Sequence, residues 1–232
     1  MSYSQLSPAP ISSTIALLVQ RIRERFPESG LARVADELVQ VSDENTRVVE
    51  QLGHPIWWLR ALTALAITAL VAVVLWAAGV VLRIARTGDA SLTELLQGAD
   101  AGTNLGILLA IAIIFLVSLE TRMKRNTALR MLHRLRSIAH VVDMHQLTKD
   151  PEHAVRDVPR TASSPVRELD PGQLARYLDY CSELLALTSK LAALHAQHLH
   201  DPVVLDAVND IESLTADLSR KIWQKITILD TR

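Results

Sequence analysis

The chain has 232 residues, a formal net charge of −1 and 49% hydrophobic residues. A charge this close to zero excludes the strongly basic footprint of a nucleic-acid-binding protein, and a single cysteine, Cys181, excludes an intramolecular disulfide and suits a reducing compartment. The mean hydropathy of +0.20 is too high for an ordinary soluble domain and too low for a mostly buried transporter, so we expect a few membrane spans attached to soluble parts.

The N-terminal segment, residues 1–56, carries two amphipathic patterns. Apolar residues recur at helical spacing over Ile11–Phe26 and again over Leu31–Leu52. Pro27-Glu28-Ser29-Gly30 separates the two predicted helices, and Gly53-His54-Pro55 ends the second. Because the first long apolar run begins only at Ala61, we expect no cleavable signal peptide.

Two apolar runs predict a transmembrane hairpin over residues 57–119. Ala61–Leu82 holds no charged residue, and a helix of this length spans a bilayer core of about 30 Å. The second predicted span is Asn104–Leu119, with a short extracytoplasmic loop over residues 83–103. Trp57 and Trp58 mark the interface where the first span begins.

Small residues recur in both predicted spans. Ala64, Thr68 and Ala72 form a stripe on which another helix can pack closely, and Gly106 and Ala110 form a matching pair. Neither span has an ionisable residue at its centre, which argues against a monomeric transporter.

Basic residues predict the orientation. They are concentrated over Arg122–Arg136, directly after the second span, and this places the C-terminal region in the cytoplasm. With two spans, the N-terminus is cytoplasmic as well, and we expect a multi-pass protein of a bacterial inner (plasma) membrane. The same cluster could bind anionic lipid head groups, but setting the topology explains it without a binding site.

The C-terminal region, residues 120–232, predicts a cytoplasmic three-helix bundle. Thr121–Lys149 continues the second span as one long helix, and residues 151–169 form a proline-rich linker. Asp170-Pro171 and Asp201-Pro202 then start two helices that form an antiparallel hairpin. Each helix carries a seam with coiled-coil spacing: Leu174, Leu178, Cys181, Leu185, Thr188, Ala192, His195 and Leu199 in the first, and Val204, Val208, Ile211, Leu214, Leu218, Ile222, Ile226 and Leu229 in the second.

Four residues are candidate ligands for zinc or a similar divalent metal: His140, Asp143, His195 and His198. Within each pair the spacing of three residues puts both side chains on one helix face, and the two pairs would have to meet in the bundle. The alternative is that His140 bonds to Asp143 on a polar face. His195 falls on an apolar seam, where a histidine fixes register, finds a buried partner or senses pH.

The sequence therefore predicts an all-α membrane protein with a two-helix hairpin, N-terminal amphipathic helices and a cytoplasmic bundle. Catalytic and phosphate-binding motifs are absent from the sequence, so we expect no enzyme and no cofactor apart from the metal considered above. A membrane-anchored interaction or scaffold protein, self-associating or docking a cytoplasmic partner, fits best. A homo-oligomeric pore subunit and a metal-dependent cytoplasmic activity are the alternatives.

Overall fold

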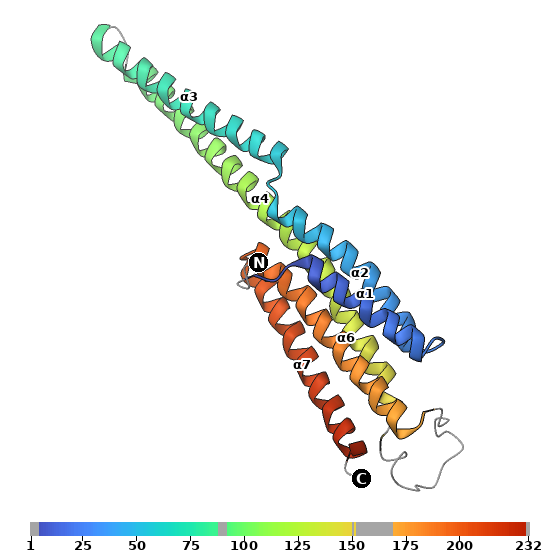
Figure 1. Cartoon of the computed structure of the whole chain (residues 1–232). Coiled ribbons are helices and arrows are strands. Elements are labelled where there is room, and N and C mark those ends of the chain that lie inside the picture. The colour runs from blue at the N-terminus through green and yellow to red at the C-terminus, as the bar shows by residue number, and fades with distance from the viewer. Residues whose placement is uncertain (1–4, 88–91, 150, 152–168, 231–232) are drawn as a thin grey trace. The chain divides into compact units, whose positions relative to one another are not determined.

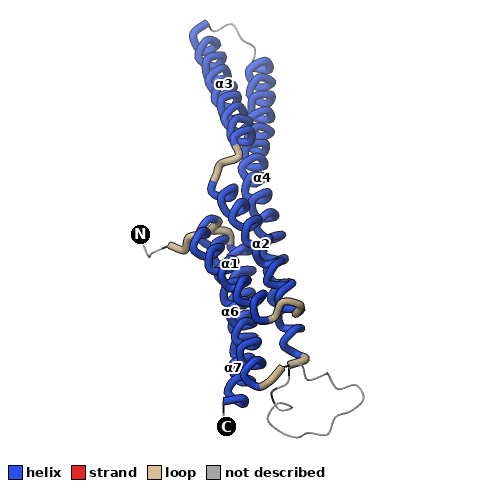
Figure 2. Tube along the Cα trace, turned by 45° about the vertical axis from the view of Figure 1, so that its right-hand side comes forward, coloured by secondary structure: helices blue, strands red, loops and turns tan. Residues whose placement is uncertain are grey.

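The computed structural model describes residues 5–87, 92–149, 151 and 169–230, and in these ranges the regular structure is helical, without a strand. This confirms the expected all-α class. Figures 1 and 2 show the helices, which are α1 (Pro8–Arg25), α2 (Gly30–Gly53), α3 (Trp57–Thr87), α4 (Leu92–Leu147), α6 (Pro171–His198) and α7 (Pro202–Asp230). The predicted linker falls almost wholly outside the described residues.

The chain divides into two compact units. The first, called the bundle here, contains residues 1–53 and 125–232, and the second, called the hairpin, contains residues 54–124. The helix α4 contributes to both, with its first part in the hairpin and its part from Arg125 onward in the bundle.

The most enclosed helix of the bundle is α6, which packs against α1, α2 and α7. Both of its apolar stripes are buried: the predicted seam, apart from the half-buried Leu199, and a second stripe over Leu184, Leu187, Leu191 and Leu194. The predicted seam of α7 is also buried, apart from the half-buried Leu214. One continuous apolar core joins residues of α1, α2, α4, α6 and α7.

The bundle therefore differs from the expected three-helix arrangement, because α1 and α2 belong to it. A helix with two buried stripes needs partners on more than one side. The apolar faces of α1 and α2, centred on residues such as Leu18 and Leu38, supply this cover and are themselves fully buried. The amphipathic N-terminal segment is therefore a structural part of the bundle.

The predicted start of α6 is confirmed. Asp170 accepts a hydrogen bond from the backbone N–H of Gln173, whose side chain accepts one from the backbone N–H of Asp170. This reciprocal pair satisfies two backbone donors at the helix N-terminus, and Pro171 occupies the first helical position.

In the hairpin, α3 packs on the first part of α4 through a regular seam. The half-buried positions of α3 are Thr63, Ala66, Leu70, Val73 and Ala77, which repeat at alternating spacings of three and four residues. On α4, Gly102 lies where an added Cβ would sit 4.0 Å from the Cβ of Ala77, so the two helices approach closely there. At the base of the hairpin, Glu120 accepts a hydrogen bond from the backbone N–H of Ile56 and pairs with Arg60 and Lys124.

The small-residue stripe of the first span does not form this contact. Ala64, Thr68 and Ala72 are exposed in the hairpin, whereas Gly106 and Ala110 on α4 are half-buried. The helices instead meet along the seam that begins at Thr63, which mixes small and larger side chains. An apolar helix without charges offers several faces of similar packing quality, so the stripe alone did not determine the contact.

The connection between the predicted spans is shorter than expected. The helix α3 continues to Thr87 and α4 begins at Leu92, so most of residues 83–103 is helical. The helix α4 extends for 56 residues to Leu147. It contains Gly98 and Gly102, so these two residues, although poor helix formers, do not interrupt it. The predicted continuation of the second span into a long helix is confirmed.

Both α3 and α4 contain an 18-residue window that is long and apolar enough to cross a membrane, and no residue of either window is buried inside the protein. This exposure differs from that of a core helix in a soluble protein, which is covered by its neighbours. Large apolar side chains of α3 such as Leu65, Leu75 and Trp76 are each 67–68% exposed.

Candidate functional site

The bundle core contains one polar pair that links α2 to α6. The side chains of Asn45 and His195 are fully buried, and 2.7 Å separates Asn45 Oδ1 from His195 Nε2. Asn45 Nδ2 also donates to the backbone carbonyl of Leu191, at 3.2 Å. Asn45 thus bridges a side chain and a main-chain group of α6, which fixes the register of the two helices.

The hydrogen-bond pattern determines the tautomer of His195. Because the Nδ2 amide of Asn45 donates to Leu191, its Oδ1 must accept, and His195 Nε2 carries the proton. His195 Nδ1 then presents a lone pair, and it has no hydrogen-bond partner among the described residues. Burial, and next the charge of His198, lower the pKa of His195 to about 4, so the ring is neutral at neutral pH.

The four candidate metal ligands are not assembled into one site. His195 is engaged with Asn45, His198 Nδ1 lies 2.9 Å from the carbonyl of Leu194, and Asp143 accepts a hydrogen bond from Gln146. His140 is exposed on α4. Within the ranges that the structure describes, no group of three or more His, Cys, Asp or Glu side chains is placed to hold a metal ion.

The antiparallel packing of α2 and α4 explains why these pairs do not meet. An added Cβ at Gly53 would lie 3.8 Å from His198, and one at Gly30 would overlap the ring of His145. His198 and His145 therefore lie at opposite ends of α2, about 35 Å apart for a helix of 24 residues. Of the candidate ligands, His195 is buried against Asn45 in the core, whereas His140 is exposed on α4, so the two pairs do not face each other. Metal binding stays a prediction that this packing does not favour.

The other end of the bundle holds the single cysteine beside two lysines. Lys225 Nζ donates to the carbonyl and to Oε1 of Gln146, at 2.8 and 2.6 Å, and so caps the C-terminal end of α4. Burial raises the pKa of Cys181 to about 12, although the charges of Lys225 and Lys149 act in the opposite direction. A fully buried thiol with this pKa is an inert core group and not a nucleophile.

An aromatic cluster closes this end. The ring of Phe26 packs edge-on against Tyr177 and Tyr180, with centroid distances of 5.4 and 6.2 Å. Arg21 lies over Tyr180 and Lys149 over Tyr177, at 5.9 and 5.4 Å from the ring centroids. Burial is the main cause that raises the pKa of Tyr177, so its hydroxyl is protonated at neutral pH. Through these ring contacts, the turn after α1 packs against the start of α6.

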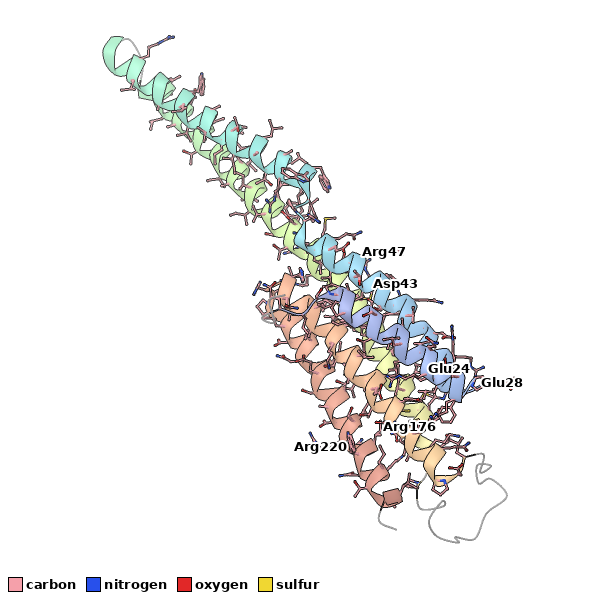
Figure 3. The ribbon with its side chains drawn as sticks, in the orientation of Figure 1. Glu24, Glu28, Asp43, Arg47, Arg176 and Arg220 are labelled. Carbon is pink, nitrogen blue, oxygen red and sulfur yellow. The ribbon has the colours of Figure 1, made fainter. Side chains whose placement is uncertain are left out.

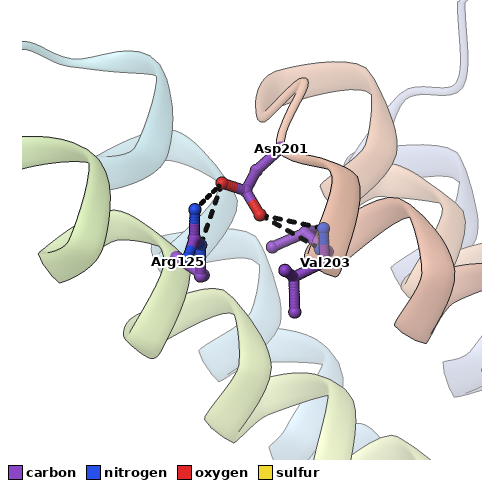
Figure 4. Close-up of polar contacts among 4 residues, drawn as sticks. Arg125, Asp201 and Val203 are labelled. Carbon is purple, nitrogen blue, oxygen red and sulfur yellow. Dashed lines mark hydrogen bonds and ion pairs between the residues drawn. The ribbon is translucent and has the colours of Figure 1, made fainter. Parts of the chain in front are cut away.

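A second polar link lies at the α6–α7 turn (Figure 4). The guanidinium of Arg125, on α4, donates two hydrogen bonds to Asp201 Oδ2, while Asp201 Oδ1 accepts from the backbone N–H groups of Val203 and Val204. Burial alone would raise the pKa of Asp201, but these four hydrogen bonds and the charge of Arg125 hold it below the ordinary value. This confirms Asp201 as the predicted cap of α7 and adds a partner on α4.

Sequence reasoning did not identify Asn45 or Arg125 as partners. Asn45 interrupts the apolar spacing of α2 between Val41 and Val49, and this position could have marked it as a buried polar residue. Arg125 was counted only in the basic cluster that sets the topology, and no sequence pattern distinguishes it from its neighbours.

The outer surface of the bundle is charged, and Figure 3 labels examples such as Asp43 and Arg47 on α2 and Arg220 on α7. The described polar clusters of the bundle stabilise helix ends and helix contacts, and none combines a reactive group with an open cavity. Comparisons with protein-family models, with curated proteins and with solved structures found no match to this chain.

Proposed function

We propose that this chain is a membrane-anchored helical interaction protein, in which the hairpin crosses a bacterial inner membrane and the bundle self-associates or docks a cytoplasmic partner. The observation that carries the proposal is that no residue of either apolar window, in α3 or in α4, is buried inside the protein. Contiguous apolar surface of this extent is costly in water, and a lipid bilayer removes that cost.

The internal contacts of the bundle support a role in binding and not in catalysis. Its buried polar groups, including the Asn45–His195 pair and the Arg125–Asp201 pair, are engaged in structural hydrogen bonds. The basic residues after the second apolar run support a cytoplasmic position for the bundle, because such residues are enriched on that side. Both termini then lie in the cytoplasm.

The first test is integration into the membrane. The expected result is that the full-length chain stays in the membrane pellet after alkaline carbonate treatment and is released only by detergent. In a variant with Val71→Arg and Leu75→Arg, two exposed positions of α3, integration should fall, because each arginine costs about 2.5–3.5 kcal/mol at the centre of a span. The matched control is Leu17→Arg at an exposed apolar position of α1, which should leave integration unchanged.

The second test is topology. Reporters fused to each end should show cytoplasmic activity, and a reporter inserted between residues 87 and 92 should show periplasmic activity. Release of the wild-type chain by carbonate, or a periplasmic terminus, would overturn the proposal. Ion flux in proteoliposomes together with a closed ring of subunits would replace it with the pore alternative.

A further inference from the structure

The surface between α2 and α4 is an open groove with an apolar floor. Val34, Val41 and Ile138 form the floor, and the groove has a volume of about 200 Å³. Val141, on its rim, is 38% exposed, and Met144, one turn further along α4, is 66% exposed. We refer to the groove together with Val141 and Met144 as the α2–α4 face.

The two sides of this face differ in charge. Glu37 lines the α2 side of the groove, whereas His133 and Arg134 line the α4 side. Arg134 and Glu44 already form an ion pair across the groove within one chain. Arg33 adds a positive charge to α2, but it acts on His145 near the end of α4. At the groove itself the charged residues of α2 are acidic and Arg134 of α4 is basic, so the groove is complementary to a rotated copy of itself.

Only one of the two possible twofold arrangements uses this complementarity. An axis parallel to the helices places α2 of one copy over α4 of the other, so that acidic residues meet basic ones. An axis perpendicular to the helices places α2 over α2 and brings like charges together. The first arrangement keeps equivalent helices of the two copies parallel.

The size of the face is sufficient for a stable dimer. The helix α2 has 24 residues and is about 35 Å long, and α4 runs beside it from Arg125 to Leu147. Two helices of about 10 Å width give roughly 700 Å² per copy, or about 1,400 Å² in total, which is within the range of specific protein interfaces.

From these observations we infer that the α2–α4 face binds a second copy of this chain, with α2 of each copy packed against α4 of the other. The inference rests on the proposed function and names the surface for the proposed self-association. Val141 and Met144 of each copy cover the apolar groove of the partner, and Glu37 of one copy lies near the row formed by His133 and His140 of the other.

The first experiment measures the dimer directly. Full-length protein in nanodiscs or mild detergent is analysed by mass photometry or analytical ultracentrifugation over a range of concentrations. We expect a monomer–dimer equilibrium whose dissociation constant rises at least tenfold in the Val141→Arg variant. Leu17→Arg is the matched control, because Leu17 is an exposed apolar residue of α1 outside the face, and it should leave the constant unchanged.

The second experiment uses disulfide trapping and leaves the apolar part of the face intact. Two differently tagged copies are expressed together, one with Glu37→Cys and the other with His140→Cys, and are oxidised in membranes. The native Cys181 is fully buried and does not interfere. The yield of disulfide-linked dimer that carries both tags should exceed the yield of dimer from either variant expressed alone. A pair made of Leu17→Cys and His140→Cys should give no linked dimer.

The outcomes separate this inference from the proposed function. The inference would be wrong if the chain were integrated in the membrane but monomeric. It would also be wrong if the chain formed a dimer that Val141→Arg did not weaken and that the Glu37→Cys and His140→Cys pair did not cross-link. In both cases the proposed anchored interaction protein would stand. A chain that leaves the membrane in carbonate would overturn the proposed function first. If Val141→Arg increased the labelling of Cys181, the variant would have opened the bundle, and the cross-linking result alone would decide.

Discussion

The two carboxylate oxygens of Asp201 bind two different helices. Oδ2 accepts both hydrogen bonds from Arg125 on α4, at 2.9 and 2.6 Å, and Oδ1 caps the N-terminus of α7. The side chain of Asp201 is only 4% exposed and that of Arg125 is 35% exposed. One residue of the α6–α7 turn therefore connects this turn to α4 within the bundle.

We expect Asp201→Ala to destabilise the bundle by about 2–3 kcal/mol, because it removes an N-cap and leaves Arg125 without its carboxylate. Asp201→Asn keeps the cap and should cost less. The measurement is the rate of thiol labelling of Cys181 in the full-length chain in detergent, since this buried group reacts only when the bundle opens. The control is Asp210→Ala, where the carboxylate is 67% exposed and 3.8 Å from Arg136, and we expect a change below about 0.5 kcal/mol. Equal effects of the two alanine variants would contradict the role given to Asp201.

The buried pair of Asn45 and His195 should show strong energetic coupling. Asn45→Leu leaves the Nε2 proton of His195 without an acceptor, and His195→Leu leaves Asn45 Oδ1 without a donor, so each should cost about 1–3 kcal/mol. The double variant should cost less than the sum, because it buries no unpaired group. Cys181 labelling again measures the opening of the bundle. The matched pair is Ser12 and Ser42, which share a hydrogen bond of 2.9 Å that is only partly buried, and their cycle should give a smaller coupling. Additive effects at Asn45 and His195 would show that the pair does not act as a unit.

The stability of the bundle should depend on pH through His195. Its pKa is about 4 in the fold and 6.5 when it is solvated, so the unfolded chain binds the extra proton between these values. Stability is therefore fully present above pH 6.5 and is lost progressively as the pH falls toward 4, by about 3 kcal/mol for this group. The charge of His198 is the second cause that lowers the pKa of His195, and Asn45 offers no second acceptor for the imidazolium.

The check is thermal unfolding followed by circular dichroism at pH 7.0 and pH 4.5. Wild-type protein should lose stability between these values, and His195→Leu should lose several-fold less. An identical loss in both proteins would assign the acid sensitivity to other groups.

Helix positions could be predicted from the sequence because their signals are local. Proline at the first helical position with an aspartate before it fixed the starts of α6 and α7, and apolar spacing predicted their buried seams. The neighbours of each seam could not be predicted in this way. A periodic stripe shows that a face is buried but not which helix covers it, and for that reason the docking of α1 and α2 onto α6 was not anticipated.

The same limit applies to the candidate site. Spacing shows that His195 and His198 share a helix face, but the distance from this pair to His140 depends on how α2, α4 and α6 align along their lengths. That alignment is determined by residues far apart in the chain, such as Asn45 with His195 and Arg134 with Glu44. In the hairpin, the face used by α3 was equally undetermined, because several faces of an apolar helix pack almost equally well.

The alignment of α2 against α4 depends on a close approach at Gly30, and this gives the last prediction. A Cβ at this position would overlap the ring of His145, which is half-buried at the end of α4. Gly30→Ala should therefore destabilise the bundle modestly, by about 1 kcal/mol, because the atoms in the way are the end of the His145 side chain, which can rotate aside. Gly53→Ala is the matched control at the other end of the same helix, where the nearest atom is 3.8 Å from the added Cβ, and it should be neutral or slightly stabilising. His145→Ala should restore most of the stability that Gly30→Ala loses, as measured by Cys181 labelling. A Gly30→Ala variant as stable as Gly53→Ala would mean that the contact between Gly30 and the His145 ring does not contribute to the stability of the bundle.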